Sequence, residues 1–193
     1  RELQVEYYAQ AREWLGDKPL SVVDMPSMCP ELSMGMLNDA DINVSDYWAI
    51  EYNRTIKNHL ASWARTKSVS EVQRFRATQG DVLETLASGS QWHQGFKWPK
   101  VDLFLLDFCG AMGSSYRAFM LPHILGRQAA PTSVVCLTFS PRSPAVPIPK
   151  VRHALTVMAP ELYGIECLSL IENTYSDTSC MCSWLAYMRK ENP

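Results

Sequence analysis

The sequence predicts an α/β fold: a mostly parallel sheet with helices on both faces, closed by an antiparallel strand. Short apolar runs alternate with amphipathic segments from residue 20 to residue 140, the pattern of strands joined by crossover helices. Several of these runs are continuously apolar, as expected of strands buried on both faces. The last two strand-like runs are separated only by SDT (176–178), and so short a connection permits only an antiparallel pair.

The N-terminal half of the chain predicts three of these alternations. A leading helix over 1–16 has apolar residues at helical spacing and ends at Gly16, a common C-terminal signal. Pro30 falls in the first turn of the next helix, where proline is tolerated. We expect strands at 20–25, 46–53 and 70–78, and helices at 30–40, 54–67 and 80–89.

The C-terminal half begins with the most apolar stretch of the chain, VDLFLLDF (101–108), which predicts a central strand. Pro122 lies inside the helix that follows it and predicts a kink or break there. We expect helices at 114–128 and 150–164, a strand at 132–140, a proline-rich loop at 140–149 and a terminal hairpin of strands at 165–175 and 179–190.

Length and composition predict a single domain over residues 1–193, with a leading helix at 1–17 and a terminal β-hairpin at 165–190. The formal net charge of −2 gives no overall basic field that would attract nucleic acid. No apolar run is long enough to cross a membrane, so we expect no membrane association.

The six cysteines are scattered along the chain, and four of them lie in apolar runs. That usage favours the reducing cytoplasm over a disulfide framework. Cys180 and Cys182 form a C-x-C pair, but no further ligands stand at a suitable spacing, so we predict no metal site.

Four acidic residues stand at or just after the carboxyl ends of the first four predicted strands: Asp24, Glu51, Asp81 and Asp107. In open α/β sheets, ligands bind outside the carboxyl ends of the strands. The sequence therefore places a candidate ligand site at that edge.

The turn after the first strand, DMPSMC (24–29), has no glycine, although nucleotide-binding folds usually place glycines there so that backbone can approach the ligand. Pro26, Ser27 and Met28 occupy those positions. Two interpretations stay open: a cofactor loop that lacks its glycines, or only a strand-to-helix corner.

The order of elements, with the motifs VVDMPSMC, WAIEYN, TQGDVLE and LLDFCGAMG, resembles the class I S-adenosylmethionine-dependent methyltransferases. The resemblance covers nearly the whole chain in topology and four short places in motifs. It implies a Rossmann-like, seven-stranded mixed sheet with an antiparallel final strand, S-adenosylmethionine as the cofactor, and methyl transfer as the reaction.

The resemblance also implies roles for the first two strand ends. Asp24, Pro26, Ser27 and Met28 correspond to the loop that lies against the methionine part of the cofactor. Glu51 corresponds to the acidic residue that binds the ribose hydroxyls, and a carboxylate suits two vicinal hydroxyls because it accepts from both. Tyr52, next to Glu51, is expected to stack on the adenine.

At the third strand end, the resemblance implies that Asp81 accepts from the adenine amino group and that Val82 touches the ring face. At the fourth, it implies that Asp107 lies at the catalytic corner with Cys109. The alternative for Glu51 and Asp81 is helix capping. Cys109 is two residues after the aspartate, one fewer than the nucleophile spacing of RNA cytosine-5 methylases, so a packed thiol is its alternative.

Two polar loops contribute further candidates. His93, in the loop over 88–100, is the best general base, and Trp92, Phe96 and Trp98 there would stack on an aromatic acceptor or cover the sheet edge. Arg142, in the proline-rich loop, would bind an anionic acceptor group. For both His93 and Arg142, the alternative is a solvated loop side chain.

The sequence thus predicts a methyltransferase whose acceptor, nucleic acid or a small molecule, is unidentified, with a partner chain as one route to nucleic-acid recognition. A non-catalytic methyltransferase-like binding module is the second hypothesis, because of the glycine-free first turn. An NAD-dependent oxidoreductase is the third, although the chain has no G-x-G-x-x-G motif.

Overall fold

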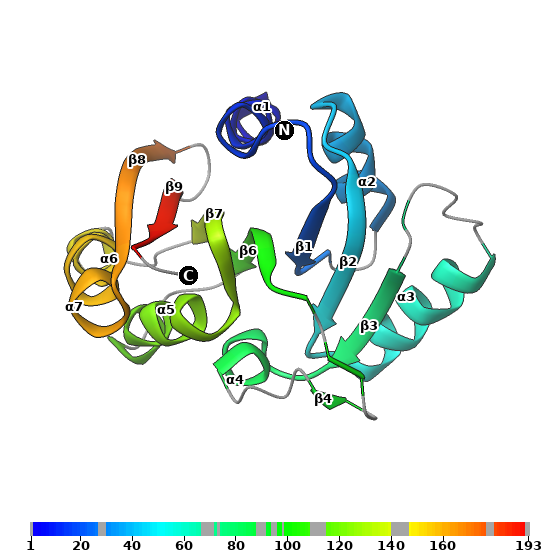
Figure 1. The fold of residues 1–193 in the computed structure, drawn as a ribbon. Helices are drawn as coiled ribbons and strands as arrows, with labels where there is room; N and C mark the ends of the chain where they lie inside the picture. The colour runs from blue at the N-terminus through cyan, green and yellow to red at the C-terminus, as the bar shows by residue number, and fades with distance from the viewer. Residues whose placement is uncertain are drawn as a thin grey trace.

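Seven strands form one mixed sheet in the order β3-β2-β1-β6-β7-β9-β8, with helices on both faces (Figure 1). The computed structural model describes residues 2–26, 30–66, 72, 74–87, 92–93, 96–97, 99–108, 115–139, 147–176 and 180–191. This arrangement confirms the predicted Rossmann-like sheet, including its antiparallel end.

Six strands of the sheet run in one direction, and β9 runs against its two neighbours, β7 and β8. The hairpin expected at the C-terminus is therefore present, with its second strand inserted between β7 and the first. The strands are β1 (Leu20–Asp24), β2 (Val44–Glu51), β3 (Arg74–Gln79), β6 (Val101–Phe108), β7 (Ala129–Phe139), β8 (Ile165–Ser176) and β9 (Cys180–Lys190).

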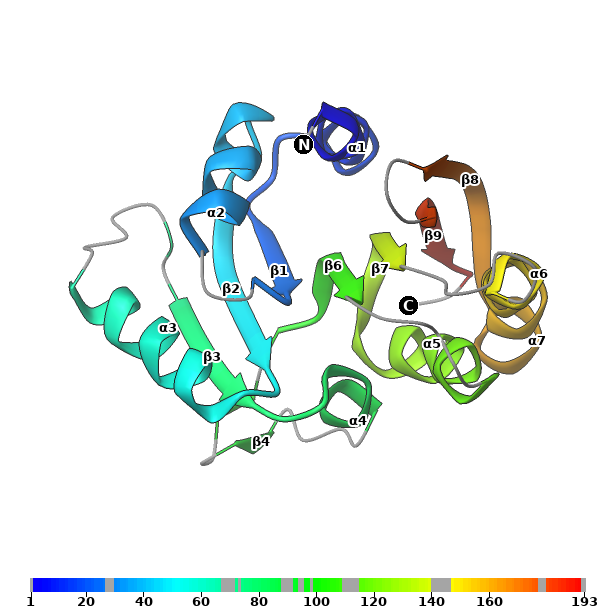
Figure 2. The same ribbon diagram turned by 180° about the vertical axis from the view of Figure 1, so that it is seen from behind.

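The helices divide between the two faces of the sheet, as the two opposite views show (Figures 1 and 2). One face carries α1 (Glu2–Leu15), α2 (Pro30–Asp39) and α3 (Arg54–Thr66). The other carries α4 (Val82–Ala87), α5 (Ser115–Gln128), α6 (Pro147–His153), the π-helical turn η1 (Ala154–Met158) and α7 (Ala159–Tyr163). Among the helices in the described part of the chain, none is both long and apolar enough to cross a membrane.

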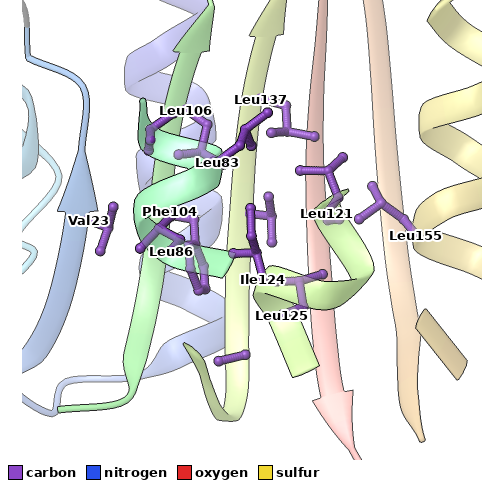
Figure 3. Close-up of a cluster of buried hydrophobic side chains, with 14 of the residues drawn as sticks. Val23, Leu83, Leu86, Phe104, Leu106, Leu121, Ile124, Leu125, Leu137 and Leu155 are labelled. Atoms are coloured by element: carbon purple, nitrogen blue, oxygen red, sulfur yellow. The ribbon is translucent and has the colours of Figure 1, made fainter. Parts of the chain in front are cut away.

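Alternation along the strands sends successive side chains to opposite cores. On β6, Phe104 and Leu106 pack toward α4 and α5, whereas Leu103 and Leu105 belong to the core under α1 and α2. Figure 3 shows the first core, where Leu86 of α4 lies close to Phe104. Because both faces are covered, the strands read as continuous apolar runs in the sequence.

Helix α1 is fixed to the antiparallel end of the sheet by two aromatic side chains. The Tyr7 hydroxyl shares a 3.1 Å hydrogen bond with Ser183 Oγ on β9 and accepts a 2.9 Å bond from Asn173 Nδ2 on β8. The Trp14 ring stacks on Tyr187 with ring centroids 5.4 Å apart. These contacts hold α1 across the sheet near the carboxyl ends of the parallel strands.

Several segments differ from the sequence predictions. Helix α5 continues through Pro122 without a break, because Ala118, Leu121 and Ile124 are buried on the same face on either side of the proline. Helix α6 begins at Pro147, inside the expected proline-rich loop; first-turn residues have no N–H partner in a helix, so proline is tolerated there. Strands β4 (Trp92–His93) and β5 (Phe96–Lys97) form a small antiparallel pair in the segment expected to be a loop.

Gly126 allows α5 and α7 to approach closely. A Cβ atom built at this position would overlap the ring of Tyr163. We expect Gly126→Ala to lower the free energy of unfolding by about 1–3 kcal/mol in urea denaturation, because the ring or the helices must shift. Tyr163→Leu removes the ring, so Gly126→Ala should lower the free energy of unfolding less in the Tyr163→Leu background than in wild type. A G126A variant as stable as wild type would contradict this packing.

Candidate active site

The register of the parallel strands brings the predicted acidic residues to one edge of the sheet. Asp24 pairs with Ala49 of β2 on one side and with Leu105 of β6 on the other. Glu51 lies two residues after Ala49, and Asp107 lies two residues after Leu105. Both side chains are therefore on the same face of the sheet as Asp24, two residues nearer the carboxyl ends of their strands. With strands roughly 4.8 Å apart, their Cα atoms are separated by roughly 10 Å across β1.

A cavity of about 320 Å³ opens at this edge, on the face covered by α1 and α2. Tyr8 of α1 and Ser33 of α2 line its walls, and Asp24 and Pro26 line it at the end of β1. Its floor includes Asp107 of β6 and Cys136 and Thr138 of β7. The volume is at the lower end of the range of small-molecule sites.

Asp24 is buried beneath the first turn and is held by hydrogen bonds. Its side chain is 4% exposed, and it accepts a hydrogen bond from the Tyr47 hydroxyl. Burial raises the pKa of this carboxyl to about 6, although hydrogen bonds from Tyr47, Ser33 and the Met25 backbone lower it. Tyr47 in turn has a pKa well above its ordinary value, first because it is buried and then because Asp24 is beside it.

Asp107 lies at the cavity, its side chain has no hydrogen-bond partner among the described residues, and burial raises the pKa of its carboxyl. Cys136, which pairs with Leu105 in the neighbouring strand, is 6% exposed. Burial, followed by the charges of Asp107 and Asp24, raises the pKa of its thiol to about 12, so the thiol stays neutral at ordinary pH. Cys136 therefore serves as an uncharged wall of the cavity.

Glu51 is half-buried at the end of β2, and its Oε1 accepts a 3.0 Å hydrogen bond from the Asn53 backbone N–H. The cap of α3 is Asn53, whose Oδ1 accepts from the N–H groups of Thr55 and Ile56 at 2.8 and 3.3 Å. The helix-capping alternative for Glu51 is thus wrong, because Asn53 caps α3. Tyr52, next to it, is 79% exposed.

Asp81 caps α4, which confirms the capping interpretation of this residue. Its Oδ1 accepts from the N–H groups of Leu83 and Glu84 at 2.9 and 3.2 Å. These bonds use one carboxylate oxygen and leave the other for a ligand. Val82 is 4% exposed and belongs to the core with Leu83, so little of its surface is left for an adenine ring.

Some predicted site residues lie outside the described part of the chain: Ser27, Met28, Trp98, Cys109 and Arg142. The described backbone includes Trp92, His93 and Phe96 in β4 and β5, but not their side chains. The roles inferred for these residues stay predictions. Within the described residues, no group of three or more His, Cys, Asp or Glu side chains could hold a metal ion.

Sequence reasoning missed the cavity residues Tyr8, Cys136 and Thr138. It also missed Tyr47, which is buried and donates a hydrogen bond to Asp24. Tyr47 and Cys136 lie inside apolar strands, where nothing local marks them as site residues. Tyr8 reaches the cavity only because α1 packs across β7 and β9, a long-range contact. Thr138 alone left a signal, as a hydroxyl near the end of an otherwise apolar strand.

No family model and no curated protein matches the sequence. Solved structures do match. A putative methylase from Haemophilus influenzae has a TM-score of 0.55 at 14% identity, over 95% of this chain and 88% of its own. Magnesium protoporphyrin IX methyltransferase from Synechocystis, with bound SAM, also has a TM-score of 0.55 at 14% identity, over 97% of this chain and 80% of its own. TrmK from M. capricolum, in complex with S-adenosyl-homocysteine, has a TM-score of 0.53 at 11% identity, over 97% of this chain and 68% of its own.

These similarities show that the chain has the fold of the class I S-adenosylmethionine-dependent methyltransferases. They confirm the resemblance that the order of elements predicted. At such low identity they establish the fold alone.

Burial of Asp24 predicts a pH-dependent stability. Its pKa of about 6 in the folded protein exceeds the ordinary 3.8, so the folded state binds this proton more tightly between those values. Stability should therefore fall as pH rises from about 4 to 6, by at most about 3 kcal/mol. In urea denaturation at pH 4 and 7.5, Asp24→Asn should gain stability relative to wild type at the higher pH. The control is Asp39→Asn at an exposed position, whose stability relative to wild type should be the same at both pH values. An effect of Asp24→Asn that is also the same at both pH values would contradict the raised pKa of Asp24.

Proposed function

We propose that this protein is an S-adenosylmethionine-dependent methyltransferase. The observation that carries the proposal is the placement of Glu51 and Asp81 on adjacent strand ends, next to a cavity bounded by Asp24 and Asp107. Further support comes from the similar structures described with SAM or with S-adenosyl-homocysteine.

The described residues suit this cofactor chemically. Glu51 and Asp81 each have a carboxylate oxygen without a described partner, and such oxygens accept from ribose hydroxyls and from an adenine amino group. The described lining of the cavity contains two carboxylates and no lysine, arginine or histidine. That negative lining favours a positively charged sulfonium. When bound, S-adenosylmethionine would supply the methyl group.

The chain's own contribution would be to position the acceptor and exclude water, since holding two reactants at the right distance provides much of the rate in such a displacement. Tyr8 of α1 and Pro26 at the end of β1 both line the cavity. Asp107, whose pKa is raised by burial, is placed to take a proton from an acceptor. Three points stay predictions: the acceptor, which is a nucleic acid or a small molecule; a partner chain; and a cytoplasmic location.

A non-catalytic binding module is the second candidate, and one feature favours it. No glycine occurs between Gly16 and Gly35, and the end of β1 is closed by buried Pro26 and by the bond between Tyr47 and Asp24. Backbone there approaches a ligand less easily than a glycine-rich turn does. Cofactor binding separates the two candidates.

Thermal unfolding and calorimetry with S-adenosylmethionine and S-adenosyl-homocysteine test the proposal. At a hundredfold excess over Kd, ligand should add about 2.7 kcal/mol of stability, which raises the Tm by several degrees. Glu51→Gln and Asp81→Asn should each weaken binding about tenfold or more, because each removes a charged acceptor.

The variants are chosen to keep the fold. Asparagine caps helices as well as aspartate, and in Glu51→Gln the side-chain amide still offers an oxygen to the Asn53 N–H. Glu84→Gln, an exposed acid on the same helix as the Asp81 cap, is the matched control and should bind as wild type does. Absence of binding at millimolar concentration of either ligand would overturn the enzyme proposal, and binding of NAD instead would favour an oxidoreductase.

A further inference from the structure

Three basic side chains of α3 have no partner in the described part of the chain. Arg54, Lys57 and Arg65 make no hydrogen bond or ion pair with any described residue. The other described lysine and arginine side chains all interact with another residue: Arg12, Lys18, Arg74, Arg76, Lys100, Arg127, Lys150, Arg152, Arg189 and Lys190. The lysine and arginine charge that the described residues leave unpaired is therefore concentrated on one helix.

The three side chains lie on the face of α3 that points away from the sheet. At about 100° per residue, Arg54, Lys57 and Arg65 fall within an arc of about 80° around the helix. Ile56 and Trp63, on the opposite side, pack against the buried cluster beneath α3. Both arginines are exposed and Lys57 is half-buried, and α3 lies at the β3 end of the sheet (Figures 1 and 2). The row is therefore accessible to a large partner.

The stability of the helix does not account for this basic row. The N-terminus of a helix carries partial positive charge, which disfavours cations in the first turn. Arg54 and Lys57 are both in that turn, three residues apart, where like charges repel each other. Only Arg65, in the last turn, suits the helix dipole, and α3 contains no aspartate or glutamate to offset the other two. A bound anion would offset them.

The spacing of the row selects an extended polyanion. At 1.5 Å per residue, the Cα atoms of Arg54 and Arg65 are roughly 16 Å apart along the helix, so one phosphate group cannot contact both. A chain of phosphates can. Asn58 is exposed on the same face, and arginine, lysine and asparagine are among the side chains that contact the phosphates of nucleic acids.

The same face lacks the features of a protein or membrane contact. The large exposed hydrophobic side chains among the described residues are Leu32, Tyr52, Phe119, Leu162 and Leu168, and none of them is on α3. Protein interfaces depend on aromatic or aliphatic anchors, and membrane-surface helices insert apolar side chains. Binding to a nucleic-acid backbone needs only the positive charges.

We propose that the outward face of α3 binds the phosphate backbone of a nucleic-acid strand through Arg54, Lys57 and Arg65. The formal net charge of −2 describes the whole chain and not this face. The inference goes beyond the proposed function, because phosphate contacts need no cofactor. Arg54 follows Glu51 by three residues, so the row begins near the edge where the cofactor is proposed to bind. A strand that continued past Arg54 would reach that edge.

The probes are fluorescein-labelled single strands of RNA and of DNA with the same mixed sequence, titrated with the full chain in the absence of cofactor. Fluorescence anisotropy should show binding whose log affinity falls with log salt concentration with a slope of about −2, because each phosphate contact in a single strand contributes about −0.7. Affinity should thus fall about twentyfold between about 50 and 200 mM NaCl. Binding of either strand supports the proposal, and the tighter one identifies the sugar.

Arg54→Gln, Lys57→Gln and Arg65→Gln should each reduce the slope to about −1.4, because each removes one phosphate contact. Arg54→Glu combined with Lys57→Glu should abolish binding and keep or raise the Tm in circular dichroism melting, since anions suit the first turn of a helix. That double variant separates lost binding from lost folding. Arg189→Gln removes the same charge from an exposed position on β9, and as the matched control it should bind as wild type does.

Two further probes test the assignment to nucleic acid: decaglutamate and vesicles that contain phosphatidylserine. Tighter binding of the peptide would assign the face to an acidic protein, and tighter binding of the vesicles to a membrane; either result would overturn the proposal. It also fails if neither strand binds at about 50 mM NaCl, or if the double glutamate variant keeps the wild-type affinity and salt slope.

Failure of the proposed function gives a different result, because these titrations contain no cofactor. If the strands bind through α3 but S-adenosylmethionine and S-adenosyl-homocysteine do not bind, the nucleic-acid surface stands and the methyltransferase proposal falls. If the cofactor binds and the strands do not, the methyltransferase proposal stands and the nucleic-acid surface falls.

Discussion

The parallel pairing of β1 with β6 is the constraint on which the rest of the structure depends. Its register places Asp24 beside Leu105, and alternation along β6 then puts Asp107 on the same face, two residues further out. A shift of one residue would turn Asp107 into the apolar core against α4 and α5 and expose Phe108 in its place. The apolar side chains on both faces thus fix the polar geometry at the carboxyl edge.

The cavity exists because α1 does not pack fully over that edge. Tyr7 and Trp14 fix the helix to β9 and β8, beyond the parallel strands, while Tyr8 reaches back over β6 and β7. Between them, Asp24 is enclosed by Tyr47, and Asp107 is left without a described partner. Two carboxylates on neighbouring strands therefore differ in environment: one is held by the fold, and the other faces the cavity.

The sequence was sufficient to predict the order of elements, because apolar runs and the short SDT connection are local signals. It also located Glu51, Asp81 and Asp107 at strand ends. It could not show that Asn53, not Glu51, caps α3, or that Asp81 caps α4, since those depend on the geometry of each turn. Tyr8 and Cys136 could not be predicted as site residues, because their position depends on packing between segments more than a hundred residues apart.

The central claim is that the carboxyl edge of this sheet is a cofactor site despite its glycine-free first turn. Amide-resolved NMR titration with S-adenosyl-homocysteine tests it most directly, because it reports where the ligand binds. The account predicts shifts concentrated at Met25, Tyr52, Val82 and Phe108, with little change at the far end of β8 and β9, near Ile165 and Lys190. Shifts confined to other surfaces, or no shifts at millimolar ligand, would contradict it.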